Sequence, residues 1–175
     1  MLRALTILAA LMTVAAPARA TTAMEVVFGC TSTKECVITM NEGGVLLLFH
    51  DAADEVRKYG TRVIVDGPCI SACVLFASIA RENVCVTRNA KMLIHLVAVK
   101  HVFDQSGKEI TPLDDIRAFF LPPPEYRVEY EYETPDYGRD INEWAARENK
   151  IPLNPKKLYT LTQQEMLMFW HPCSQ

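Results

Sequence analysis

The sequence predicts a single α/β domain, and three observations lead to this class. Short β-type runs alternate with helical segments along the first hundred residues, which is the pattern of an α/β fold. The chain has 175 residues, about the length of one domain. Half of them (50%) are hydrophobic and 22% are charged, a composition that excludes a wholly disordered chain.

The predicted elements follow one another with short turns between them. Residues 45–59 carry apolar side chains at helical spacing, and Gly60 follows as a helix-ending glycine. Residues 71–80 are almost wholly apolar, which predicts a buried helix. The runs with strand character are 25–28, 36–40, 62–66, 84–87 and 92–99. The turns fall at 41–44 and 67–68.

The composition changes beyond about residue 100. Residues 102–110 are compatible with a local hairpin, three prolines at 122–124 interrupt any regular element, and 125–137 is acidic and rich in tyrosine. We interpret 101–135 as an elaborated loop, in which the Glu-Tyr alternation at 129–133 suits an edge strand or a solvated loop.

Two short helices are predicted after this loop. The first covers 139–149, and the second covers 162–170 with Thr162 as its N-cap and Glu165 completing a capping box. No internal repeat and no second domain is evident, so one domain is predicted over residues 21–175.

The first 20 residues are predicted to be a signal peptide. Arg3 supplies a positive charge, residues 4–16 form an apolar run of suitable length, and Ala-Arg-Ala at 18–20 is a cleavage site. An uncleaved membrane anchor is the alternative, although the run is short for one. We therefore expect export to the bacterial periplasm or the medium, with no membrane contact after cleavage.

Cleavage would leave an acidic chain. It removes Arg3 and Arg19 and no acidic residue, so 16 basic and 21 acidic groups remain, a net charge of −5. That charge argues against non-specific binding to nucleic acid, so no nucleic-acid partner is expected.

All six cysteines lie beyond the predicted cleavage site, at Cys30, Cys36, Cys69, Cys73, Cys85 and Cys173. An even number in an exported protein is typical of a disulfide framework. Cys30 and Cys36 flank a polar turn, so we predict that they pair. Cys69 and Cys73 are at most one helical turn apart, so each is predicted to bond a distant partner, drawn from the remaining two. A zinc site is the alternative, but no C-x2-C or H-x3-H spacing supports it, and neither a metal nor a cofactor is expected.

The most informative stretch is Gly-Pro-Cys-Ile-Ser-Ala-Cys at 67–73. It places Ser71 between a predicted strand and a buried helix, where free backbone N–H groups and the helix dipole favour developing negative charge. The N–H of Ala72 can then help to stabilise an oxyanion. The alternatives are that Ser71 is only an N-cap, or that Cys69 or Cys73 is the reactive group.

Two further features favour catalysis. Gly43 and Gly44 precede a predicted helix, and a glycine there lets backbone N–H groups approach a substrate carbonyl. His95 lies on a predicted apolar strand, and histidine is the usual base that activates a serine hydroxyl. A core histidine is the alternative for His95. We predict that Ser71 and His95 lie within side-chain reach of each other.

Together these residues resemble the Clp-type protease branch of the ClpP/crotonase superfamily. The resemblance rests on Gly-Gly-Val at 43–45, a serine and a small residue opening a buried helix, and Met-x-Ile-His at 92–95. The spacings, 27 residues from Gly44 to Ser71 and 24 from Ser71 to His95, are similar to those of the family. The Cys-x-Ser-Ala-Cys motif is similar to that of exported bacterial proteins of this fold. The resemblance covers about residues 36–97 and implies a stacked ββα spiral.

Carried onto these positions, the resemblance implies a serine hydrolase, in particular a peptidase acting on a peptide or protein through an acyl-enzyme. Ser71 would be the nucleophile, His95 the general base, and Gly44 and Ala72 the oxyanion donors. The long helix that builds the Clp ring is not evident in 101–135, so a ring is not expected, although another oligomer is compatible with the sequence.

The third member of the implied triad falls on Asn154, counted back from Leu-Thr-Gln-Gln-Glu at 161–165, where Clp proteases have an Asp. An Asn can orient an imidazole but cannot offset its positive charge. Asp136 or Asp140 is the alternative for this role. A second hypothesis follows from the substitution: a catalytically weak or inactive relative that binds a peptide or partner protein in the same groove.

Overall fold

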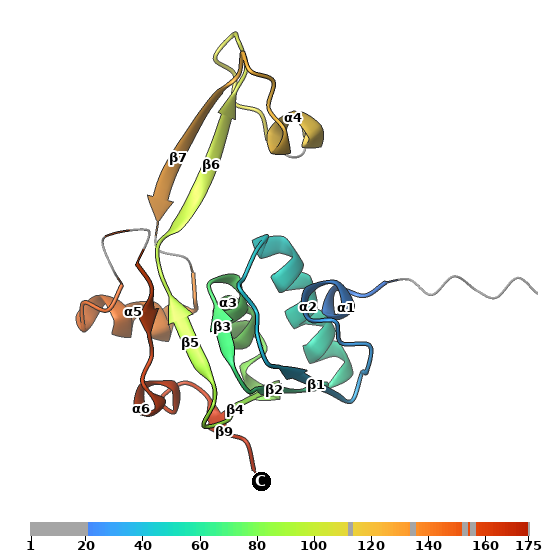
Figure 1. The fold of residues 1–175 in the computed structure, drawn as a ribbon, viewed down its shortest axis with the longest axis vertical. Helices are drawn as coiled ribbons and strands as arrows, with labels where there is room; N and C mark the ends of the chain where they lie inside the picture. Colours follow the sequence, from blue (N-terminus) through green and yellow to red (C-terminus); the bar gives the residue numbers. More distant parts are fainter. Residues whose placement is uncertain (1–20, 112–113, 134–135, 152–153, 155–156, 175) are drawn as a thin grey trace, which may run out of the picture.

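The computed structural model describes residues 21–111, 114–133, 136–151, 154 and 157–174. Within them the chain forms a mixed α/β fold, which confirms the predicted class. A body of sheets and helices carries a long two-stranded arm that extends away from it (Figure 1). The predicted signal peptide at 1–20 lies outside the described residues.

Two sheets form the body. The first contains β1 (Glu35–Ile38), β2 (Arg62–Val65), β4 (Val84–Val86) and β9 (His171–Pro172), in this order and all parallel. In the second, β3 (Pro68–Ile70) and β5 (Lys91–Ile94) are parallel and β8 (Tyr159–Thr160) is antiparallel to β5. The chain crosses between the sheets at Gly67, where a Cβ would lie 1.9 Å from the Thr39 carbonyl oxygen, so only glycine fits.

Two packed helices cover the sheets, α2 (Leu46–Tyr59) and α3 (Ala72–Ile79). The predicted apolar stripe is buried at Phe49, Ala52, Ala53 and Val56, but its first residues, Val45, Leu46 and Leu48, are exposed. Gly60 ends α2 in the left-handed conformation, as expected. α3 is buried from Ala72 to Ala77, which explains why it is apolar on all sides. One continuous core joins both helices to both sheets.

The predicted strand at 25–28 is wrong, because these residues belong to the helix α1 (Ala23–Phe28). The Thr22 hydroxyl caps its start, and the Glu55 carboxylate accepts hydrogen bonds from the N–H groups of Ala23 and Met24, each at 3.0 Å. A short apolar run in a sequence does not distinguish a strand from a helix, and here the capping hydrogen bonds favour the helix.

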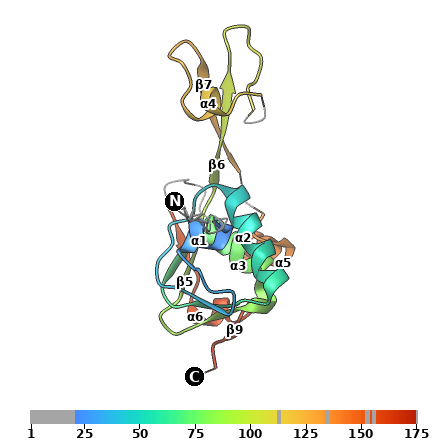
Figure 2. The same cartoon turned by 90° about the vertical axis from the view of Figure 1, so that its right-hand side faces the viewer.

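The arm consists of β6 (Val97–Phe103), β7 (Arg127–Glu133), α4 (Ile116–Phe120) and the described residues between them. β6 and β7 are antiparallel, and Figure 2 shows them rising from the body as a narrow ribbon. The predicted hairpin over 102–110 is present at the tip of the arm, where Phe103 pairs with Glu109 and the Ile110 N–H donates to the Val102 carbonyl at 2.7 Å. Along the rest of its length β6 pairs with the tyrosine-rich segment, so the elaborated loop is largely regular structure.

The last elements close the body. The helix α5 (Arg139–Arg147) buries Ile141, Trp144 and Ala145, as the sequence predicted for a short helix there. The predicted capping box of α6 (Gln163–Met166) is present, with Thr162 and Glu165 bonded reciprocally. α6 is shorter than the predicted 162–170, although its Met166 is buried. Between α3 and β4 the chain makes the short 3-10 helix η1 (Arg81–Asn83).

Candidate active site

The turn at Ser71 has an unusual backbone. Ser71 joins β3 to α3 with φ 57° and ψ −116°, a conformation that L-residues rarely adopt. Asn149 is the other described non-glycine residue with positive φ, and asparagine tolerates that region better than serine does. Such backbone strain at a strand-to-helix turn is typical of exposed nucleophiles.

The Ser71 hydroxyl does not serve the helix that it precedes. Ser71 occupies the N-cap position of α3, yet its side chain accepts no hydrogen bond from the N–H groups of the first turn, all of which belong to described residues. A capping serine would satisfy one of those donors. The structure therefore does not support the interpretation of Ser71 as a simple N-cap.

The two glycines lie directly beside this turn. A Cβ on Gly43, which has φ 85°, would come within 2.7 Å of the Ile70 carbonyl oxygen and 3.0 Å of the Ser71 Cβ. The Asn41 side chain accepts a hydrogen bond from the Gly43 N–H at 2.9 Å and fixes this approach. No described residue accepts a hydrogen bond from the N–H of Gly44 or Ala72. Both groups are available as donors, and their oxyanion role stays a prediction.

His95 directly follows β5 (Lys91–Ile94), in the break before β6, and not on a strand as predicted. The Ser71 N–H donates to the Leu93 carbonyl at 3.0 Å, which ties the serine turn to β5 just before His95. The Nδ1 atom of His95 lies at hydrogen-bond distance from the Leu96 carbonyl. A carbonyl can only accept, so this contact places the proton on Nδ1 and leaves Nε2 as an acceptor.

A cavity of about 370 Å³ brings the predicted residues together. It is lined by Gly44, Leu46, Ser71, His95, Val99, Lys100 and Phe119. Ser71, His95 and Gly44 thus share one cavity, between the body and the base of the arm. Within the described residues, Ser71 and His95 are not hydrogen-bonded to each other, and such bonds often form only with substrate present.

The sequence did not single out Tyr137, the fully buried residue behind this cavity. Its hydroxyl donates to the His95 carbonyl and accepts from the His95 N–H, both at 3.2 Å, and it lies near enough to the Ser71 side chain to affect its own pKa. Burial raises the pKa of Tyr137 to about 12, although the contacts with His95 and Ser71 act in the opposite direction. Tyr137 is therefore a neutral phenol that contacts both predicted catalytic residues. No spacing or motif in its acidic, tyrosine-rich segment marks it.

The residues proposed for the third position lie elsewhere. Asn154 is exposed and does not line the cavity, and residues on both sides of it are outside the description. Asp136 accepts a hydrogen bond from the Gly138 N–H, and Asp140 pairs with Arg81, which lowers its pKa. The acceptor found beside the His95 Nδ1 is the Leu96 carbonyl, so an orienting role for Asn154 stays a prediction.

The disulfides agree with the expected framework and correct its pairing. Cys30 pairs with Cys36, as predicted. Cys69 pairs with Cys73 and not with a distant partner, and Cys85 pairs with Cys173. The prediction treated Cys69 and Cys73 as successive turns of one helix. In fact Cys69 lies in the middle of β3, and the sharp turn at Ser71 brings the two Cα atoms to 5.2 Å, within bonding range.

Two classes of site are not found among the described residues: no cluster of His, Cys, Asp and Glu could hold a metal ion, and no helix has the length and apolar character to span a membrane.

Comparison with solved structures finds chains of similar fold, among them a bacterial ClpP. A ClpP1 mutant from Listeria monocytogenes aligns with 79% of this chain and 71% of its own, at 15% sequence identity and a TM-score of 0.39. No protein-family model matches the sequence, and no curated protein matches it. The roles proposed below therefore rest on this chain's own residues, and the ββα spiral implied by the sequence resemblance stays a prediction.

Proposed function

We propose that this protein is an exported serine hydrolase that acts on peptides or proteins through an acyl-enzyme at Ser71. The observation that carries the proposal is the strained turn at Ser71, a residue whose hydroxyl leaves the helix uncapped and which lines the same cavity as His95. Strain in the backbone needs a compensating use, and presenting a nucleophile is the use that fits this position.

The chemistry follows from the positions of these groups. The Ser71 Oγ attacks the substrate carbonyl while its proton passes to Nε2 of His95. The resulting oxyanion accepts hydrogen bonds from the N–H groups of Gly44 and Ala72. The protonated His95 then gives its proton to the leaving group, and water releases the acyl group by the same steps in reverse order.

No carboxylate among the described residues lines the cavity to offset the charge on the protonated His95. The Leu96 carbonyl can orient the ring but carries only a partial charge. Loss of the Asp from a well-studied triad lowers turnover by a factor on the order of 10⁴, so a slow enzyme is expected. The same observation favours the second candidate function, a catalytically weak relative that binds a peptide or partner protein in this cavity.

A fluorophosphonate probe separates the two candidate functions. A hydrolase should be labelled, and Ser71→Ala should abolish the labelling because the nucleophile is gone. Ser78→Ala is the matched control, since Ser78 lies on the same helix α3 and bonds Arg81 at 3.2 Å. Labelling that survives Ser71→Ala would contradict the assignment. An unlabelled protein whose Ser71→Ala variant still binds peptides would support the binding function.

Export is proposed from the leader-like sequence of residues 1–20 and from the disulfides. Three disulfides use all six cysteines, and structural disulfides persist in oxidising compartments such as the bacterial periplasm. N-terminal sequencing of the exported protein should begin at Thr21. A start at Met1 in protein recovered from the periplasm or medium would contradict cleavage.

A further inference from the structure

We infer that Lys100 makes the cavity selective for acyl groups that carry a carboxylate, an inference that rests on the hydrolase function proposed above. The substrate class would be acyl compounds with an apolar stem and an anionic group a few bonds from the reacting carbonyl. The carboxylate can belong to an acidic side chain or to a chain end, and the chemistry of recognition is the same for both.

The cavity combines apolar walls with one cation. Leu46, Val99 and Phe119 form its apolar lining. Among the described residues that line it, Lys100 alone carries a permanent charge. A volume of about 370 Å³ is sufficient for one side chain or a short acyl group. A group bound there would thus meet hydrocarbon on most sides and one ammonium.

The ammonium of Lys100 is held at the wall of the cavity. Its Nζ donates to the Phe119 carbonyl oxygen at 2.6 Å and lies 5.4 Å from the centre of the Phe119 ring. An ammonium has three donors, so two remain after this bond. The contact with Phe119 restricts a side chain that would otherwise be flexible, which reduces the entropy lost when a ligand binds.

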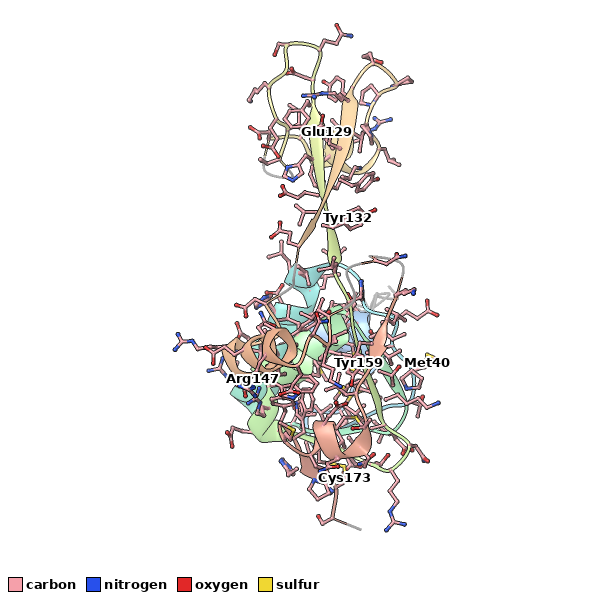
Figure 3. All side chains as sticks on the ribbon, turned by 90° about the vertical axis from the view of Figure 1, so that its left-hand side faces the viewer. Met40, Glu129, Tyr132, Arg147, Tyr159 and Cys173 are labelled. Carbon is pink, nitrogen blue, oxygen red and sulfur yellow. A yellow bond between two sulfur atoms is a disulfide. The ribbon has the colours of Figure 1, made fainter. Side chains whose placement is uncertain are left out.

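No described carboxylate forms an ion pair with this charge. On β7, Tyr130 lies directly opposite Lys100, while Glu129 and Glu131 lie opposite His101 and Val99. Successive side chains of a strand point to opposite faces, so these glutamates lie on the other face of the ribbon. Glu131 approaches His101 at 3.8 Å instead. Figure 3 shows Glu129 on the arm, farther from the body than Tyr132.

A cation without an anionic partner, beside a nucleophile in an apolar cavity, favours an anionic ligand. A carboxylate would accept charge-assisted hydrogen bonds from the two remaining Lys100 donors. The whole chain has a formal charge of −3, so its overall charge repels anions and the attraction must be local. The structural alternative is that Lys100 only fastens α4 to β6 through the Phe119 carbonyl.

Matched esters test the inference. The para-nitrophenyl ester of hexanoic acid and the mono-para-nitrophenyl ester of hexanedioic acid have the same chain length and differ in one carboxylate. We expect the Ser71-dependent rate to favour the diacid ester by about five- to tenfold, since one half-exposed charged pair contributes modestly. Lys100→Met should remove the preference, Lys100→Glu should reverse it, and added salt should weaken it.

Lys91→Met is the matched control, because Lys91 is an exposed strand lysine that does not line the cavity. It should leave the preference unchanged. An unchanged ester ratio in Lys100→Met would overturn the inference. Peptides with Glu or Gln in the acyl part, and peptides with free or amidated ends, distinguish the two sources of the carboxylate.

A binding measurement tests the selectivity for a carboxylate independently of whether the protein is a hydrolase. Hexanedioic acid monoamide and hexanamide are titrated into Ser71→Ala protein and followed by NMR. Tighter binding of the monoamide that is lost in Ser71→Ala with Lys100→Met supports the inference even if no ester is hydrolysed. Equal binding of the two amides overturns it, whether or not the hydrolase function holds.

Discussion

The body and the arm are held together in different ways. The body has a core of both sheets and both main helices, three disulfides, and glycines that let its segments pack at close range. The arm has a small core of Val102, Ile110 and Ala118, and no cysteine lies between β6 and β7. Covalent and close-packed constraints are therefore concentrated around Ser71, while Lys100 and Phe119 reach the cavity from the less constrained arm.

The largest expected effect is the loss of the long-range disulfide of the body. Cys85 and Cys173 are 88 residues apart, and Cys30 and Cys36 only 6. Replacing the first pair by alanine should lower the free energy of unfolding by about 4–5 kcal/mol, and the second pair by about 2–3 kcal/mol, because longer loops lose more unfolded-state entropy. Urea unfolding measures both. Equal losses would contradict the loop-length argument.

Two glycines with nearly the same φ allow the cost of a close contact to be measured apart from the cost of a positive φ. Gly43 has φ 85° and Gly107, in the arm, has φ 83°, but a Cβ on Gly107 would meet nothing within 4 Å. Gly107→Ala should cost about 1 kcal/mol for its conformation alone, and Gly43→Ala about 3 kcal/mol because the turn must also move. Thermal unfolding compares the two variants. Similar losses would mean that the body relaxes around Gly43 as easily as the arm does around Gly107.

Tyrosine-to-phenylalanine variants measure how much a single hydroxyl contributes to stability in the body and in the arm. Tyr137→Phe leaves the His95 N–H and carbonyl without partners and should cost about 1–3 kcal/mol. It should also slow fluorophosphonate labelling of Ser71 about tenfold, the rate equivalent of 1.4 kcal/mol. Tyr130→Phe in the arm should change stability by less than about 0.5 kcal/mol.

Tyr159→Phe is the control for a purely structural effect of Tyr137. Tyr159 lies beside β5, and its hydroxyl bonds the Glu165 carboxylate at 2.8 Å, away from the cavity. It should lose stability without a change in the labelling rate. If Tyr159→Phe and Tyr137→Phe slow labelling equally, Tyr137 acts only through the fold.

The smallest expected effect is a pH dependence in the arm. The Glu109 carboxylate, 2.7 Å from the His101 ring, raises the pKa of His101 above its ordinary 6.5. The ion pair therefore stabilises the folded arm fully at pH values below the pKa that His101 has in the unfolded chain. This stabilisation is lost as the pH rises through the pKa of His101 in the folded protein. NMR titration should show that Glu109→Gln lowers this pKa while labelling of Ser71 stays unchanged. An unaltered titration would contradict the ion pair.

Local signals in the sequence predicted much of the body and of the site. Helix α2, the capping box of α6, and the strand-to-helix placement of Ser71 depend on neighbouring residues, so they could be inferred from spacing and turn chemistry. The two glycines and His95 were also found, because a recognisable spacing links them to Ser71.

The features that were missed depend on contacts between distant segments. Tyr137 reaches His95 across 42 residues, and β6 pairs with β7 across the whole arm. The Cys69–Cys73 pairing was missed for a local reason, since it depends on a positive φ at Ser71 that serine rarely adopts. The helix α1 depends on caps from Thr22 and from the distant Glu55.

The Cys69–Cys73 disulfide also places Ser71 inside a small covalent ring. Both sulfurs belong to fully buried residues, and the ring joins the middle of β3 to the first turn of α3. Transient fraying of a helix end normally releases the residues before it, but here the ring holds those residues to the neighbouring strand. Fluctuations that loosen α3 therefore leave the chain reversal at Ser71 closed, and amide exchange at this turn should follow the opening of the whole body.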